Sequence, residues 1–120
     1  MKKILVLVMV LVATSTFTFA IKPSDYKVFY DLNNERTFNR TINYLGADKS
    51  QADYLKLVFN VTAEELNSAS KTSNEKLAEN VVNYNLYNVK CILSENQYNK
   101  YLALINLSIY NDKQILIAQN

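Results

Sequence analysis

The sequence of 120 residues contains no histidine, only one cysteine and only one glycine. Histidine is the commonest general base and a frequent zinc ligand, so its absence excludes the usual hydrolytic triads and most zinc geometries. A single cysteine excludes a Cys-x-x-Cys redox site and any disulfide within the chain. A single glycine excludes a glycine-rich phosphate loop and disfavours a protein built from many β-hairpins.

Two carboxylate pairs are the remaining candidates for acid–base or metal chemistry. Glu64 and Glu65 are expected in a first helical turn, where the helix dipole favours negative charge. Glu75 and Glu79 stand one helical turn apart on an expected solvent-exposed face, beside lysine residues. Both pairs are therefore interpreted as structural. We predict no enzyme activity, no cofactor and no metal site.

The first twenty residues have the three parts of a secretory signal peptide. Lys2 and Lys3 are basic, Ile4 to Ala13 include no polar side chain, and the small residue Ala20 ends the segment. The apolar run is shorter than the ~20 residues that span a bilayer, which favours a cleaved signal over an uncleaved membrane anchor. We predict removal of residues 1–20 and export to the periplasm or beyond, with no integral membrane segment left.

The predicted mature chain, residues 21–120, is long enough for one domain with a modest core. Without Lys2 and Lys3 it has eleven basic and eleven acidic residues and a formal net charge of zero. The basic residues are also scattered, so we expect no nucleic-acid partner. Cys91 lies in an apolar run, which predicts a buried thiol; the alternative is a disulfide between two chains.

Apolar residues recur at helical spacing through most of this domain, and turn residues are scarce. The pattern predicts an all-α fold, a small bundle or hairpin of about four amphipathic helices. The expected helices cover 25–45, 51–59, 63–91 and 95–110, with a polar stretch near 70–74 that could interrupt the third. Gly46 stands where a left-handed residue would end the first helix. The tail, 113–120, is expected to form a short strand or to fray.

Two expected helix starts share one pattern, a hydroxyl residue followed three positions later by Glu or Gln. The first is Thr62 with Glu65, and the second is Ser94 with Gln97. In such a capping box the hydroxyl accepts a hydrogen bond from a first-turn amide, and the Glu or Gln side chain reaches back to the amide of the cap residue. We therefore predict that helices begin at Thr62 and Ser94.

Four tyrosines form two pairs at a spacing of three residues, Tyr84 with Tyr87 and Tyr98 with Tyr101. A tyrosine ring has an apolar body and a polar tip, so these side chains could contact a partner protein at modest desolvation cost. In the alternative, which we favour, Tyr84 and Tyr98 belong to the core and the other two are half-exposed packing residues.

The repeated capping pattern resembles the Leu-Thr-x-x-Gln motif of the Spy/CpxP-type periplasmic proteins. Residues 93–97 differ from that motif by Ser for Thr, and residues 61–65 by Val for Leu and Glu for Gln. The resemblance covers about 48–111 and implies a helical hairpin-like fold, usually a cradle-shaped homodimer, in which the motif residues are architectural. It also implies an ATP-independent chaperone or an accessory protein of envelope stress or metal response.

These observations predict an exported, non-enzymatic binding protein, a Spy-like periplasmic chaperone or envelope-stress accessory protein. Its expected partners are unfolded client proteins or one specific envelope protein, and a second copy of the chain. The alternative is a secreted interaction subunit or inhibitor that docks a single protein partner through a helix face.

Overall fold

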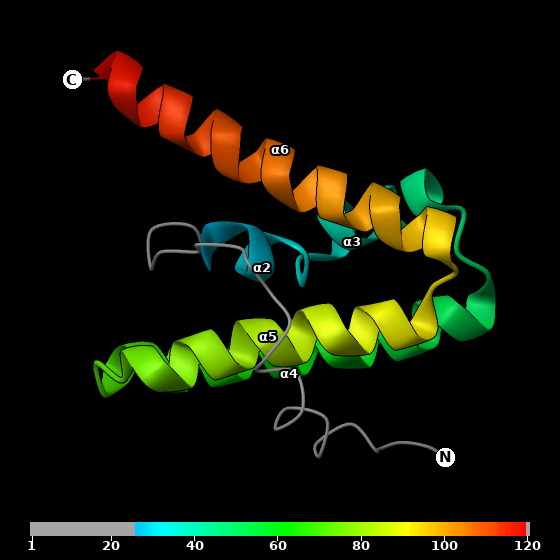
Figure 1. The fold of residues 1–120 in the computed structure, drawn as a ribbon, viewed down its shortest axis with the longest axis horizontal. Coiled ribbons are helices and arrows are strands. Elements are labelled where there is room, and N and C mark those ends of the chain that lie inside the picture. The colour runs from blue at the N-terminus through cyan, green and yellow to red at the C-terminus, as the bar shows by residue number, and fades with distance from the viewer. Residues whose placement is uncertain (1–25, 120) are drawn as a thin grey trace.

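The structure of the protein is a computed structural model that describes the backbone of residues 26–119 and the side chains of residues 26–111. Within the described residues the chain forms five helices and no strand (Figure 1). They are α2 (Lys27–Asp31), α3 (Glu35–Leu45), α4 (Lys49–Lys71), α5 (Glu75–Ile92) and α6 (Glu95–Gln119). The prediction of an all-α fold is confirmed. The predicted signal peptide lies outside the described residues.

The described helices are arranged as a V (Figure 1). One arm is the antiparallel hairpin of α4 and α5, and the other is α6. The short helix α2 lies between the arms and contacts both, whereas α3 lies against α6. The V is closed where α4 and α6 begin, and it is open where α4 turns into α5. At the open end, the last turns of α6 stand clear of the other described helices (Figure 1).

The predicted single helix at 25–45 is two helices in the structure. Asn34 separates them, because its extended backbone cannot continue α2 and its side chain caps α3. Its Oδ1 atom accepts hydrogen bonds from the amides of Arg36 and Thr37, at 3.1 and 3.3 Å. α3 ends at Gly46, which adopts a left-handed φ of +69° as its position predicts.

The predicted break between helices at 59–63 is wrong, since α4 runs unbroken from Lys49 to Lys71. Thr62 is not a cap: its hydroxyl donates a hydrogen bond to the carbonyl of Val58, at 2.7 Å. A hydroxyl that bonds four residues back belongs to a helix interior. The chain breaks instead at 72–74, within the polar stretch that could interrupt the third predicted helix.

α6 also departs from its predicted end. The sequence predicts a stop at Asn111 and a strand-like or frayed tail, but α6 continues to Gln119. Asn111 and Asp112 lower helix propensity by well under about 1 kcal/mol each, and neither glycine nor proline follows them. A weak stop signal of this kind does not end a helix of 25 residues.

A row of aromatic rings joins α3, α4 and α6 in the core. Phe38 meets Phe59 edge to face at 5.9 Å between ring centroids, and Phe59 stacks on Tyr101 at 6.0 Å. Tyr101 in turn stacks on Tyr98 at 6.3 Å. Such pairs contribute about 0.5–1.5 kcal/mol beyond the burial of their area. The row therefore helps to hold α6 against the rest of the fold.

A chain of buried hydrogen bonds runs from α6 through α5 to α4. The Tyr101 hydroxyl donates to Asn85 Oδ1 at 2.6 Å, and Asn85 Nδ2 donates to Thr62 Oγ1 at 3.0 Å. The Thr62 hydroxyl in turn donates to the Val58 carbonyl, which completes the chain of hydrogen bonds. Tyr101, Asn85 and Thr62 are fully buried, so each bond satisfies a polar group that water cannot reach. This is the role of Thr62 in the structure.

Candidate functional site

The first turns of α4 and α6 carry two complete capping boxes at the closed end of the V. Asp48 Oδ1 accepts from the amide of Gln51 at 2.8 Å, and Gln51 Oε1 accepts from the amide of Asp48 at 3.0 Å. Ser94 Oγ accepts from the amide of Gln97 at 3.2 Å, and Gln97 Oε1 accepts from the amide of Ser94 at 2.9 Å. The capping pair Ser94–Gln97 thus lies at a helix start, whereas Thr62 and Glu65 lie inside α4.

The two capping boxes are joined through their glutamines, a pair that we call the glutamine clasp. Gln51 Nε2 donates to Gln97 Oε1 at 2.8 Å, and Gln97 Nε2 donates to Gln51 Oε1 at 3.2 Å. Gln51 also donates to the carbonyl of Ile92, and Gln97 to that of Gly46, at 3.2 and 3.1 Å. Each glutamine therefore caps its own helix and bonds the segment before the other helix. The clasp closes the V with uncharged amides and has no reactive group.

Sequence reasoning missed the first of these two boxes, although a signal for it is present. Ala47-Asp48-Lys49-Ser50-Gln51 has an apolar residue, a capping residue and a glutamine at the same spacing as Leu93-Ser94-Glu95-Asn96-Gln97. Aspartate caps a helix as well as serine does. The pattern therefore repeats after 46 residues rather than after 32, and both copies end in glutamine.

The four tyrosines proposed as protein contacts do not form an exposed surface. Tyr84, Tyr98 and Tyr101 are buried, and only Tyr87 is half-exposed. Tyr84 and Tyr98 occupy the core positions that the favoured interpretation assigns to them. The expectation of a half-exposed Tyr101 is wrong, because this ring lies at the centre of the aromatic row.

Stability is expected to fall at high pH because these phenols are buried. Burial raises the pKa of Tyr84 to about 12, with a contribution from Glu65, and raises that of Tyr98 to about 12, with a contribution from Cys91. In the unfolded chain the same hydroxyls ionise near pH 10. Ionisation therefore favours the unfolded state first, and stability is lost as the pH rises from about 10 to about 12. The midpoint of urea denaturation should be steady from pH 7 to pH 9 and fall above pH 10. A midpoint unchanged at pH 12 would contradict this reading.

The prediction of a buried thiol is wrong, since Cys91 is exposed. It lies in the last turn of α5 on the side that faces solvent, while Val89 and Leu93 on either side of it are buried. The neighbouring Cys91 raises the pKa of the Tyr87 hydroxyl, mainly by charge repulsion and also by a hydrogen bond between the two side chains.

A thiol reagent such as dithionitrobenzoate should modify one equivalent of Cys91 rapidly without denaturant, because the side chain is exposed. Modification that requires urea would show that the thiol is covered.

The four carboxylates of the two predicted pairs do not come together in one site within the described residues. Glu64, Glu65, Glu75 and Glu79 are all exposed. Of these four residues, Glu75 lines a hollow at the beginning of α5. No group of three His, Cys, Asp or Glu side chains in the described part of the chain could hold a metal ion. None of the described helices is long and apolar enough to cross a membrane.

Among the side chains of residues 26–111, large apolar ones are exposed at six positions, with exposed fractions of 37% to 59%. Four of them form two pairs at a spacing of three residues, which places both members on one side of a helix. We call Tyr54 and Leu57 the α4 pair, and Leu107 and Tyr110 the α6 pair. Tyr44 lies under the ammonium group of Lys100, 5.6 Å from the ring centroid, and Tyr30 borders a hollow.

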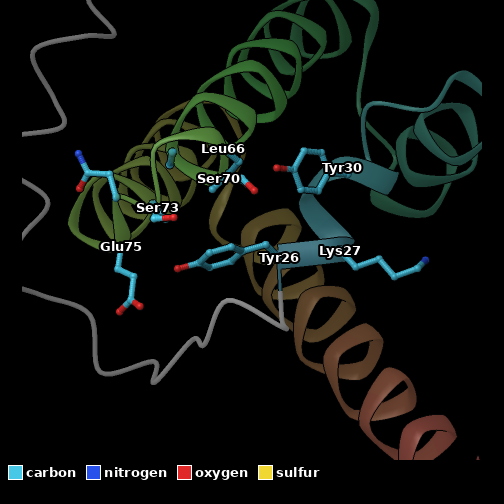
Figure 2. A pocket seen from close by; sticks show the side chains of 10 residues that line it. Tyr26, Lys27, Tyr30, Leu66, Ser70, Ser73 and Glu75 are labelled. Atoms are coloured by element: carbon cyan, nitrogen blue, oxygen red, sulfur yellow. The ribbon is translucent and has the colours of Figure 1, made fainter.

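The hollow lies at the open end of the V, is about half open to solvent and has a volume of about 500 Å³ (Figure 2). We call it the open-end hollow. The beginning of α2, the end of α4 and the beginning of α5 surround it. Its lining residues are Tyr26, Lys27, Tyr30, Leu66, Ala69, Ser70, Ser73, Asn74, Glu75 and Ala78. The volume falls in the range of about 300–1,000 Å³ that is typical of ligand pockets.

Comparisons with protein-family models, with curated proteins and with solved structures found no match to this chain. The resemblance to the Spy/CpxP-type proteins therefore rests on the capping pattern.

Proposed function

We propose that this chain is an exported binding protein that holds partly folded proteins without ATP, as a Spy-like periplasmic chaperone or envelope-stress accessory protein. The observation that carries the proposal is the exposure of the α4 pair and the α6 pair, in which each side chain leaves 45% to 59% of its surface in solvent. Single exposed apolar residues are common on protein surfaces. Two large apolar side chains next to each other, as on both α4 and α6, form a small apolar patch that can bind another apolar surface. Such patches suit weak contact with the apolar segments that a partly folded protein exposes.

Charge supports the same mode of binding. The predicted mature chain has eleven basic and eleven acidic residues, so its formal net charge is zero. Capture would then depend on apolar contact rather than on long-range attraction. The affinity of such binding should change little when the salt concentration is raised from about 0.05 to about 0.5 M. The affinity of charge-driven capture would fall over the same range, because salt screens the attraction.

The repeated capping pattern supports the family resemblance. With the first copy placed at 47–51, both copies consist of an apolar residue, a capping residue and a glutamine at the spacing of Leu-Thr-x-x-Gln. Both also act as helix starts. The resemblance implies a homodimer, and self-association stays a prediction that sedimentation velocity at micromolar concentration would test.

The experiment that tests the proposal is light scattering of a chemically denatured client diluted into buffer without ATP. The protein, purified after export, should suppress scattering at near-stoichiometric amounts. A variant that combines Tyr54→Ser and Leu57→Ser in the α4 pair should suppress it several-fold less. The matched control combines Lys56→Ser and Asn60→Ser, two exposed polar positions on the same helix, and should behave as the unaltered protein does.

Several results would contradict the proposal. Equal loss of activity in both double variants would show that the apolar pair has no special part. An absence of suppression with every client would favour the alternative, a secreted subunit or inhibitor with one specific partner. That alternative predicts one tight stoichiometric complex instead of weak binding to many unfolded proteins.

A further inference from the structure

We propose that the open-end hollow accepts one uncharged aromatic side chain from a bound client protein. The inference rests on the proposed function, since it assigns part of client recognition to a defined pocket. The α4 and α6 pairs offer open apolar surface, whereas the hollow is a half-open pocket walled by α2, α4 and α5. Its walls and its charge both point to the same kind of occupant.

Small side chains create the space. Ala69 and Ser70 in the last turn of α4 face Ala78 in the first turns of α5, and Ser73 lies in the turn between these helices. Leucine or phenylalanine at these positions would fill the hollow. Leu66, Ala69 and Ala78 are themselves buried, so they form an apolar floor. An aromatic ring inserted against this floor would contribute about 25 cal/mol of favourable binding free energy for each Å² of apolar surface that is removed from water.

Two tyrosines form the wall opposite the serines. Tyr26 and Tyr30 stand four residues apart at α2, and Figure 2 shows their rings projecting toward Ser70 at the end of α4 and Ser73 in the turn that follows. Tyr30 keeps 37% of its surface exposed, and its partial burial raises the pKa of its hydroxyl. Aromatic rings pack on one another edge to face or offset, which favours an aromatic over an aliphatic occupant.

The rim of the hollow does not select a charged ligand. Among the described residues that line it, Glu75 is the one acid and Lys27 the one base, and the ammonium group of Lys27 lies 2.7 Å from the carboxylate of Asp31. A phosphate or carboxylate would meet no cluster of cations there. The exposed hydroxyls of Ser70 and Ser73 can donate to or accept from the backbone of a peptide that crosses the rim.

The chain contains nine tyrosines but no tryptophan, so a peptide with a single tryptophan, excited at a wavelength that tyrosine does not absorb, gives the only tryptophan emission in the sample. The probe is an uncharged peptide of about ten residues, chosen to be too short for stable structure of its own. Addition of the exported protein should shift its emission to shorter wavelength and saturate. Ser70→Phe, which fills the hollow from an exposed position, should weaken binding about tenfold. Its control is Ser68→Phe, also exposed in the last turns of α4 but not in the lining, which should bind as the unaltered protein does.

A second pair of variants keeps the test valid if Ser70→Phe does not fold. Tyr30→Ser removes part of the wall and should weaken binding, whereas Tyr44→Ser removes a similarly exposed tyrosine outside this hollow and should not. Equal binding by Tyr30→Ser and Tyr44→Ser, or by both Ser→Phe variants, would overturn the assignment. If the protein suppresses aggregation but does not bind the peptide, the hollow proposal fails and the proposed function stands. If it does neither, both fail.

Discussion

Replacement of Tyr101 by phenylalanine is expected to lower the free energy of unfolding by about 1–3 kcal/mol, because it leaves a buried acceptor without a donor. The Tyr101 hydroxyl is the donor to Asn85 Oδ1, and both side chains are fully buried. Phenylalanine preserves the ring and its stacking on Phe59, so the loss reports the hydrogen bond rather than the packing. Urea denaturation followed by circular dichroism measures the change.

Tyr98→Phe is the matched control, one turn earlier on the same helix. Tyr98 is also buried, but within the described residues its hydroxyl has no hydrogen-bond partner. Removing an unpaired buried hydroxyl relieves a desolvation cost, so stability should stay the same or rise by up to about 1 kcal/mol. Equal losses from Tyr98→Phe and Tyr101→Phe would contradict the assignment of the buried hydrogen-bond chain.

Replacement of Gln97 by alanine is the second change with a large expected effect. The Gln97 side chain makes four hydrogen bonds, to the amide of Ser94, to the Gly46 carbonyl and two with Gln51. At about 0.5–1.5 kcal/mol for each bond, and with partial replacement by water, the free energy of unfolding should fall by about 2–3 kcal/mol. Gln51→Ala should cost a similar amount. The double variant should lose less than the sum, with a coupling of about 1 kcal/mol or more.

Glu65→Ala separates the observed capping boxes from the one that the sequence suggested. Glu65 lies in the interior of α4 with an exposed side chain and no hydrogen bond to a cap residue. Its replacement should change stability by no more than about 0.5 kcal/mol. A loss as large as that of Gln97→Ala would mean that a helix begins at Thr62 after all.

The contrast between Thr62 and Ser94 shows what a short pattern can and cannot decide. Both present a hydroxyl residue followed by Glu or Gln, yet only Ser94 begins a helix. Around Thr62 the buried residues Val58, Phe59 and Leu66 continue one helical face without a gap. The partner that explains Thr62 is Asn85, 23 residues away on another helix. The sequence close to Thr62 therefore does not reveal its hydrogen-bond partner.

The all-α class follows from local properties, whereas the closed and open ends of the V depend on distant pairs. Helical spacing and scarce turn residues suffice to predict helices. The glutamine clasp joins residues 46 positions apart, and the open-end hollow needs α2 to meet the α4–α5 turn. The apolar run around Cys91 predicts a buried thiol and the tyrosine spacing predicts a half-exposed Tyr101. Both predictions are wrong, because the packing of α5 and α6 decides which side of each helix is covered.

The central proposal is that this protein binds client proteins in their unfolded form and does not bind the same clients in their native form. The most direct test is a fluorescence anisotropy titration of one labelled client in two forms, native and reduced with its cysteines alkylated so that it cannot refold. The account predicts saturable binding of the unfolded form without ATP, with a dissociation constant on the order of micromolar, and no binding of the native form. Equal affinity for both forms, or no binding of the unfolded form by the exported protein, would contradict it.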